Sequence, residues 1–414
     1  MGERMNLTKR RWLVLAASCL VNLCIGSLYA WSVFAGPMAA YLSTVTGSKI
    51  VSLAVVFTIA NAVGPITMIS GGYINDKLGP KWVIFIGGIL FGLGMLLSGF
   101  TKSVEMLAMT YGFGVGLGMG MVYGCTVSNS VKFFPDKRGL AGGIATASYG
   151  ISSVLVPIVA NALINRMDVT MAFKLLGAVM LVIICVCAFF IIPCPRDFKP
   201  DGWEPVVRTE DGAQNNKNWR AMLKDPTFCV MIIMLCCGAF CGLMVISQAS
   251  PIAQRIIGMS AAEAATAVSV LALCNTAGRI LAGVVSDKFG AVNTIFGVFL
   301  LSIVGSGLLC LCGTGSTTLF YVGLLLVGFS FGSIMGIYPG FTASQFGTQN
   351  NSVNYGIMFI GFAAAGTFGP MIMSALYSGT GNDRLAFIIA AALAALGAVL
   401  TLVFRKMQKK RILS

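Results

Sequence analysis

The sequence contains no histidine, and only 14 of its 414 residues are Asp or Glu. Charged residues make up 10% of the chain, where a soluble domain carries about 25%. So few charges could not cover a water-facing surface of this size, which excludes a soluble enzyme, a nucleic-acid-binding protein and a secreted disulfide scaffold. Without histidine, zinc, haem and His-based acid–base chemistry are disfavoured too.

Motifs for enzymatic chemistry are also missing. Nearly all of the 13 cysteines lie inside apolar stretches, and no CxxC pairs with metal-binding spacing occur. The chain has no Walker loop and no paired carboxylates within an apolar run. We therefore expect no enzymatic activity, no cofactor and no metal site.

Long apolar stretches dominate the sequence instead, since 57% of the residues are hydrophobic and 50 are glycine. A membrane span needs about 20 predominantly apolar residues, so the chain has room for about a dozen. The only long polar connection is 193–226. We predict an all-α integral membrane protein with an N-terminal bundle (1–192), a cytoplasmic linker (193–226) and a C-terminal bundle (227–414), six helices in each. The expected spans are 12–34, 51–73, 82–100, 106–130, 139–164, 171–192, 227–248, 263–285, 291–312, 318–341, 354–377 and 384–404.

The net charge of +14 has a topological explanation. Most Lys and Arg residues flank the spans on one side of the predicted topology, together with both termini, and cytoplasmic loops carry such an excess. We expect both termini in the cytoplasm, an uncleaved first helix and a multi-pass protein of the plasma membrane. The basic residues would contact anionic lipid head groups rather than nucleic acid.

The two halves repeat each other at a nearly constant offset. The stretch GYINDKLG at 72–79 recurs as GVVSDKFG at 283–290. Pro37 and Pro251 would follow the first and seventh spans at matching places. Further pairs in register are Pro157 with Pro370 and Tyr123 with Tyr338. Several coincidences in the same register indicate parallel structural repeats.

This repeat resembles the loop signature of the major facilitator superfamily, G-x3-D-[RK]-x-G-x-[RK]. The resemblance implies two pseudo-symmetric bundles around a midplane site, with alternating access. A carboxylate at the signature position suits a helix N-terminus, so Asp76 and Asp287 would act as latches of a closed cytoplasmic side. A tight solvated turn with topogenic lysines is the alternative. The first copy consists of Gly72, Asp76, Lys77, Gly79 and Lys81, and the second of Gly283, Asp287, Lys288 and Gly290.

Further stretches are similar to the oxalate/formate antiporter family, which is related to the monocarboxylate transporters. They occur in order along the whole chain, which makes the match more specific than any single piece. They are YAWSVFAGP (29–37), GFGVGLGMGMVYG (112–124), FFPDKRGLAG (133–142), GWEP (202–205), WRAMLKDPTF (219–228), NTAGR (275–279) and NYG (354–356).

Arg279 is the charge that the predicted topology places deep within a span. An intramembrane Arg costs about 2.5–3.5 kcal/mol even on lenient insertion scales, so an anion, a water cavity or carbonyl groups must meet it. Its planar fork fits a carboxylate. The alternatives are snorkelling toward the cytoplasm and structural pairing with backbone carbonyls.

In the resembled family an Arg at this place binds the substrate carboxylate, and aromatic side chains wall the pocket. Packing between helices and an interfacial aromatic belt are alternative roles for each Tyr. The resemblance implies wall positions at Tyr29, Tyr123, Tyr149, Phe331, Met335 and Phe359.

Two departures from the related families restrict the substrate. Oxalate transporters of this family have a Lys where this chain has Phe362, and monocarboxylate transporters have an Asp where it has Asn275. One cation beside an aromatic favours a cargo with one carboxylate and an apolar tail over oxalate. The missing acid makes proton symport by that route doubtful, so anion exchange or facilitated movement is favoured.

We therefore predict a transporter that moves a small organic anion, with a monocarboxylate as the favoured cargo, and that functions as a monomer in the bilayer. Proton-coupled monocarboxylate transport and oxalate/formate transport remain open. Drug efflux would require a wider cavity and usually an intramembrane acid. A transporter-like sensor would require a larger soluble domain, and a channel a continuous polar pore.

Overall fold

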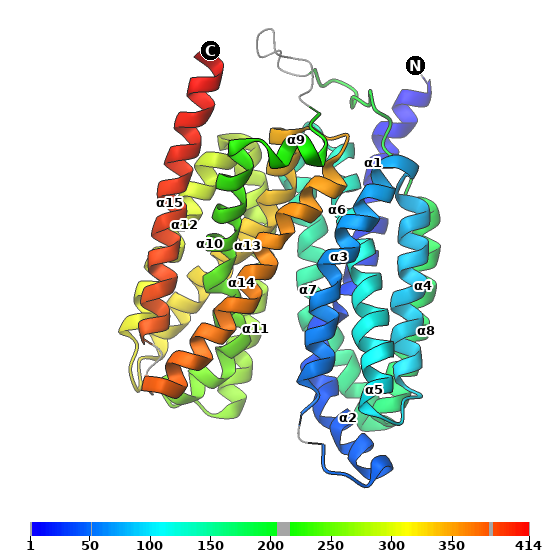
Figure 1. Ribbon diagram of the computed structural model, residues 1–414, viewed down its shortest axis with the longest axis vertical. Coiled ribbons are helices and arrows are strands. Elements are labelled where there is room, and N and C mark those ends of the chain that lie inside the picture. Colours follow the sequence, from blue (N-terminus) through cyan, green and yellow to red (C-terminus); the bar gives the residue numbers. More distant parts are fainter. Residues whose placement is uncertain (1, 51, 205–215, 381–383, 414) are drawn as a thin grey trace. The chain divides into compact units, whose positions relative to one another are not determined.

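The computed structural model describes residues 2–50, 52–204, 216–380 and 384–413. Within these residues it contains helices and no strands (Figure 1). Residues 205–215 of the predicted linker lie outside the described residues. The helices are α1 (Gly2–Ile25), η1 (Gly26–Ala30), α2 (Trp31–Thr46), α3 (Ala54–Leu78), α4 (Pro80–Ser98), α5 (Val104–Leu107), η2 (Ala108–Val115), α6 (Gly116–Phe133), α7 (Arg138–Arg166), α8 (Val169–Phe190), α9 (Trp219–Leu223), α10 (Pro226–Ile252), η3 (Ala253–Ile257), α11 (Ala261–Phe289), α12 (Ala291–Leu311), α13 (Thr317–Phe346), α14 (Asn351–Thr380) and α15 (Arg384–Leu413).

Twelve helical segments of the described chain are long and apolar enough to cross a membrane, which confirms the predicted number of spans. Helices form here because a backbone in hydrocarbon must satisfy its N–H and C=O groups within its own segment. Each predicted span coincides with one of these segments. The short helix α9 lies within the predicted linker.

The prediction for Pro37 and Pro251 was wrong, because both prolines lie inside helices. The first membrane segment runs from Leu7 to Thr46, well beyond its predicted end, and α2 contains Pro37. Pro251 lies near the end of α10. Proline removes one helical hydrogen bond, which a long helix tolerates with a local bend. A 3₁₀ turn, η1, precedes α2, and a π turn, η3, follows α10.

The chain forms two compact units, each described here by itself. Unit 1 comprises residues 1–136, 148–216 and 343–357, and unit 2 comprises 137–147, 217–342 and 358–414. Unit 1 therefore includes the first residues of α14, and unit 2 includes the first residues of α7. The division of the chain at the linker stays a prediction.

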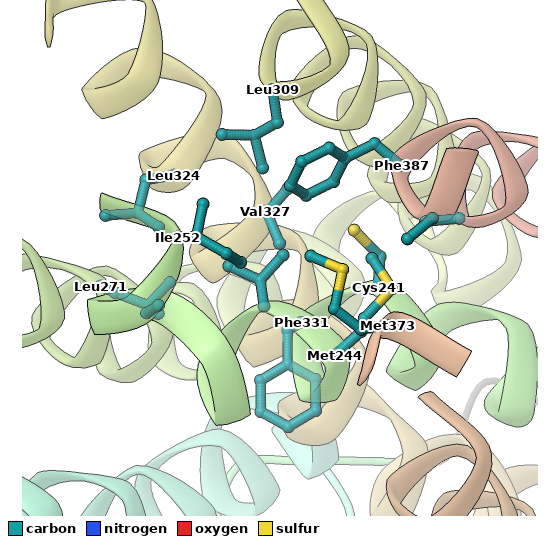
Figure 2. Close-up of a cluster of buried hydrophobic side chains, with 14 of the residues drawn as sticks. Cys241, Met244, Ile252, Leu271, Leu309, Leu324, Val327, Phe331, Met373 and Phe387 are labelled. Atoms are coloured by element: carbon teal, nitrogen blue, oxygen red, sulfur yellow. The ribbon is translucent and has the colours of Figure 1, made fainter. Parts of the chain in front are cut away.

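Inside unit 1, α4 packs against α8, and α3 packs against α6. Glycines bring α6 close to α3, since a Cβ on Gly120 would lie 2.0 Å from the carbonyl oxygen of Gly64. In unit 2, α10 and α12 each pack against α15. A buried hydrophobic cluster fills this unit, with contributions from Met244, Leu324 and Phe387 (Figure 2).

Acidic residues cap two helices next to their membrane segments. The Asp168 carboxylate accepts hydrogen bonds from Thr170 and Met171 at the start of α8, and these bonds hold its pKa below the usual range. Burial alone would raise the pKa of Asp225, but the hydrogen bonds from Lys217 and Thr227 lower it overall. Asp225 thereby fixes the start of α10 as an ionised cap.

Candidate functional site

Arg279 is buried in unit 2, with 1% of its surface exposed. Its Nε donates a hydrogen bond to Oδ1 of Asn275, one turn earlier on α11, over 3.1 Å. Its Nη1 donates to the carbonyl oxygen of Thr146 on α7 over 2.7 Å. The structure thus brings together the predicted residues Arg279 and Asn275 and adds a backbone acceptor that has no sequence signal.

Glycines allow this close approach of helices around Arg279. A Cβ on Gly143 of α7 would lie 2.4 Å from the carbonyl oxygen of Arg279, and one on Gly336 of α13 only 2.3 Å from it. On α13, one turn before Gly336, a Cβ on Gly332 would lie 1.9 Å from the carbonyl oxygen of Asn275. Larger side chains at these positions would force the helices apart, so the glycines let α7 and α13 pack closely against the backbone of α11 at Arg279.

Both hydrogen-bond acceptors of the Arg279 guanidinium are neutral groups, a side-chain amide and a backbone carbonyl. Since it is almost fully buried, it does not snorkel into solvent. The hydrogen bond to the Thr146 carbonyl agrees in part with the alternative that Arg279 pairs with backbone carbonyls. None of the ion pairs among the described residues includes Arg279. The arrangement can therefore accept an anion.

Aromatic side chains lie beside Arg279 in the same unit. The guanidinium carbon is 6.0 Å from the ring centroid of Phe331 on α13. Phe331 stacks with Phe362 of α14 at 6.3 Å, and Phe362 stacks with Phe359 at 4.3 Å. Met335 is buried one turn after Phe331. These side chains belong to one packed apolar group beside the guanidinium.

The three predicted tyrosines lie together in unit 1. The ring of Tyr149 on α7 is 5.2 Å from that of Tyr29 in η1 and 4.9 Å from that of Tyr123 on α6. Gly26 allows the contact between η1 and α7, because a Cβ there would lie 2.4 Å from the carbonyl oxygen of Tyr149. Tyr123 and Tyr149 are buried and Tyr29 is half-buried, so the structure brings the three predicted tyrosines together in one packed cluster.

Asp76 lies at the end of α3 in unit 1, where it meets the start of α14. Its Oδ1 accepts a hydrogen bond from Nζ of Lys132 over 2.7 Å, and its Oδ2 accepts one from the backbone N–H of Val353 over 3.0 Å. Gly72 makes room for α14, since a Cβ there would lie 2.8 Å from the carbonyl carbon of Ser352. The carboxylate thus satisfies N–H groups at a helix N-terminus.

Asp287 makes the corresponding arrangement in unit 2. Its two carboxylate oxygens accept hydrogen bonds from the backbone N–H groups of Gly139 and Leu140 over 2.7 and 2.8 Å. Gly283 permits this contact, because a Cβ there would lie 2.2 Å from the carbonyl oxygen of Gly139. Asp287 therefore binds the first turn of α7, and its role as a latch stays a prediction.

The remaining signature residues have other surroundings. Gly79 and Gly290 have φ angles of +88° and +85°, which explains glycine at both turns. The ammonium of Lys77 lies 4.3 Å from the ring centroid of Tyr73, and that of Lys81 lies 4.5 Å from Phe189. Lys288 is exposed.

Sequence reasoning missed Lys132 as the partner of Asp76, because it treated this lysine as a topological charge only. It also missed two hydrogen bonds that side-chain amides donate near this pair. Asn75 donates to Oγ of Ser352 over 2.5 Å, and Asn351 donates to Oγ of Ser128 over 3.1 Å. The polar run at the start of α14 could have indicated these contacts, since orphan N–H groups there need acceptors.

Comparisons with known proteins agree with this architecture. The family profile of the Major Facilitator Superfamily matches residues 20–370. The uncharacterized MFS-type transporter YhjX of Escherichia coli K12 is 29% identical over 86% of both chains. The oxalate:formate antiporter of Oxalobacter formigenes is 29% identical over 94% of this chain and 90% of its own.

Among solved structures, the transporter FucP in its outward conformation is similar with a TM-score of 0.72. It is 14% identical, and the match covers 94% of this chain and 98% of that chain. This likeness shows the fold, and the predicted fold class of twelve membrane helices is confirmed. The chain therefore belongs to the Major Facilitator Superfamily of membrane transporters.

Proposed function

We propose that this transporter moves a small organic anion with one carboxylate and that Arg279 binds the carboxylate. The observation that carries the proposal is the buried guanidinium, whose described hydrogen-bond acceptors, Asn275 and the Thr146 carbonyl, are both neutral. A buried charge without a counter-charge is costly, and the cargo would supply the missing negative charge. The similarity to an oxalate:formate antiporter supports an anionic substrate.

In this proposal the aromatic side chains provide the apolar walls of the binding site. Phe331, Met335, Phe359 and Phe362 would serve in unit 2. The tyrosine cluster of unit 1 (Tyr29, Tyr123 and Tyr149) would supply further ring surface and hydroxyls, a role that rests on the family resemblance.

The proposed transport mode is anion exchange or facilitated movement. Asn275 holds Arg279 with a neutral amide, and the chain contains no histidine. Proton coupling through an acid next to the guanidinium is therefore not part of the proposal. Asp76 and Asp287 would serve as latches of the closed cytoplasmic side, because each binds backbone N–H groups at the start of a helix.

The proposed setting is the plasma membrane, with both termini in the cytoplasm and a monomer as the functional form. The distribution of Lys and Arg along the sequence supports this orientation.

A ligand-stabilisation experiment tests the proposal. Thermal unfolding of purified protein would be followed with formate, acetate, lactate, pyruvate and oxalate, since a ligand raises the unfolding temperature by mass action. We expect monocarboxylates to stabilise the wild type and Arg279→Gln to lose every shift. Arg220→Ala, which alters an exposed arginine on α9, is the matched control and should retain the shifts.

Two results would contradict the proposal. If Arg279→Gln keeps the carboxylate shifts, this residue does not bind the substrate. If lipophilic cations stabilise the wild type and no carboxylate does, drug efflux becomes the better interpretation.

A further inference from the structure

The start of α7 runs antiparallel along α11 within unit 2 and is held to it at two points. At the first point, the Thr146 carbonyl accepts a hydrogen bond from Arg279. At the second point, Asp287 accepts hydrogen bonds from the N–H groups of Gly139 and Leu140. Arg279 and Asp287 lie about two turns apart on α11, a distance of about 12 Å. We call these three hydrogen bonds the α7 clamp.

Glycines bring the two backbones into contact between the ends of the α7 clamp. A Cβ on Gly143 would lie 2.4 Å from the carbonyl oxygen of Arg279. A Cβ on Gly283 would lie 2.2 Å from the carbonyl oxygen of Gly139. Because two turns of a helix transmit strain as a stiff element, a shift of α7 away from Arg279 also disturbs the hydrogen bonds to Asp287. The two ends of the clamp are therefore mechanically linked.

Helix α13 also packs on α11 at Arg279, but along a longer seam. Cβ atoms on Gly328, Gly332 and Gly336 would each lie between 1.9 and 3.1 Å from a carbonyl oxygen of α11. All of this seam belongs to unit 2, whereas only residues 137–147 of α7 do and the rest of α7 belongs to unit 1. Fewer contacts within unit 2 thus hold α7 to Arg279 than hold α13.

The burial of Arg279 implies that its surroundings move when a cargo binds. With 1% of its surface exposed, the side chain offers no face on which a carboxylate could sit. A carboxylate attracts a guanidinium more strongly than a neutral carbonyl does, and it can bind the planar fork through two oxygens. The Thr146 carbonyl lies inside α7 and keeps its helical hydrogen bonding when the guanidinium leaves. Separation of α7 from Arg279 is therefore the least costly route to the charge.

We infer that the cargo carboxylate and the Thr146 carbonyl are alternative partners of Arg279, so that cargo binding releases the α7 clamp. The inference rests on the proposed function, because it requires a carboxylate bound at Arg279. Release of Thr146 withdraws α7 from α11 and breaks the hydrogen bonds to Asp287. Arg279 thereby transmits occupancy of the binding site to the proposed latch.

The physical consequence is a reciprocal coupling. A ligand shifts a conformational equilibrium only by its different affinities for the two states, and any change that favours the state it prefers strengthens its binding. Weakening the α7 clamp at Asp287 must therefore increase the affinity for a carboxylate that binds at Arg279. A site in which Arg279 keeps Thr146 as its partner would show no such gain.

The first test is titration calorimetry of purified full-length protein with formate, acetate, lactate and pyruvate. Asp287→Asn replaces a charged acceptor of two backbone N–H groups with a neutral amide, so we expect carboxylates to bind about three- to tenfold more tightly. Asp168→Asn is the matched control, since Asp168 also accepts backbone N–H bonds at a helix start but lies outside the clamp. Its affinity for carboxylates should equal that of the wild type.

The second test needs no variant and therefore decides even if Asp287→Asn does not fold. Hydrogen exchange of the wild type is measured with and without a saturating concentration of the same acids. Exchange in residues 138–147 should become faster by about threefold or more, although a bound ligand ordinarily slows exchange. Residues 328–336, in the seam of α13, should show no acceleration.

The outcomes separate this inference from the proposed function. If carboxylates bind the wild type and Asp287→Asn shows equal or weaker affinity, the inference is wrong and the proposed function stands. The same conclusion follows if exchange in residues 138–147 slows or stays unchanged when a carboxylate binds. If none of the acids binds the wild type, the proposed function fails, and this inference fails with it.

Discussion

The Nη1 of Arg279 donates a hydrogen bond to the backbone carbonyl of Thr146, 2.7 Å away, and this bond ties α11 to α7 within unit 2. The two residues belong to different halves of the sequence repeat. A backbone carbonyl replaces the acidic partner that a buried arginine would otherwise require. The charge of the guanidinium is therefore not cancelled by the groups that position it.

The glycines around Arg279 should tolerate no side chain. Gly143→Ala would place a Cβ 2.4 Å from the Arg279 carbonyl oxygen, so α7 and α11 would have to separate. We expect a loss of about 1–3 kcal/mol in stability, measured by thermal or denaturant unfolding in detergent. Gly297→Ala on α12, where a Cβ meets no atom within 4 Å, is the matched control and should change stability by no more than about 1 kcal/mol. Equal effects of the two variants would argue against close packing at Gly143.

Asn275 should keep the guanidinium available to an anion. Asn275→Asp would place a carboxylate at the position that now accepts a hydrogen bond from Nε of Arg279. We expect carboxylate binding to weaken by about tenfold at neutral pH, because the new acid competes with the ligand for the positive charge of Arg279. Binding should recover as the pH falls and the acid becomes protonated. Asn293→Asp, on the exposed surface of α12, should show neither effect, and a pH-independent Asn275→Asp variant would speak against this role.

Asp76 and Lys132 should be energetically coupled. Their ion pair of 2.7 Å is largely buried, so removing one partner leaves the other without a counter-charge. In a double-mutant cycle with Asp76→Asn and Lys132→Met, we expect a coupling energy of about 0.5–3 kcal/mol in the unfolding free energy. The corresponding cycle of Asp76→Asn with Lys81→Met serves as the control and should give a smaller value, since Lys81 contacts aromatic rings instead. Additive effects in the first cycle would show that the pair is not coupled.

The Asp225 cap should make stability depend on pH in the acidic range. The folded state holds the pKa of Asp225 below the ordinary value of about 3.9, so its contribution is complete above that value and is lost as pH falls through the folded pKa. Thermal unfolding measured from about pH 6 to about pH 3, a range that brackets the ordinary Asp pKa of about 3.9, follows this change. The stability advantage of wild type over Asp225→Asn should shrink on acidification. An advantage that does not change with pH would mean that the ionised cap does not stabilise α10.

The sequence by itself determined the twelve membrane helices, the two-copy signature and the isolated arginine. It could do so because a bilayer requires long apolar segments whose backbone groups are paired internally, and such segments can be recognised from local composition. Even the tendency of Asp76 and Asp287 to bind helix starts followed from the chemistry of a carboxylate in a short turn. The prediction for Pro37 and Pro251 failed because a proline signal can end a helix or only bend it, and packing decides between the two.

Only the tertiary structure decided which atoms meet Arg279, Asp76 and the aromatic rings. The acceptor at Thr146 is a backbone carbonyl, and every residue has one, so no side-chain pattern could reveal it. The pairing of Asp76 with Lys132 and the stacking of Phe331 on Phe362 join residues far apart in the chain. Such contacts depend on how closely glycines let the helices approach, which is a property of the packed bundle and leaves no periodic trace in either segment.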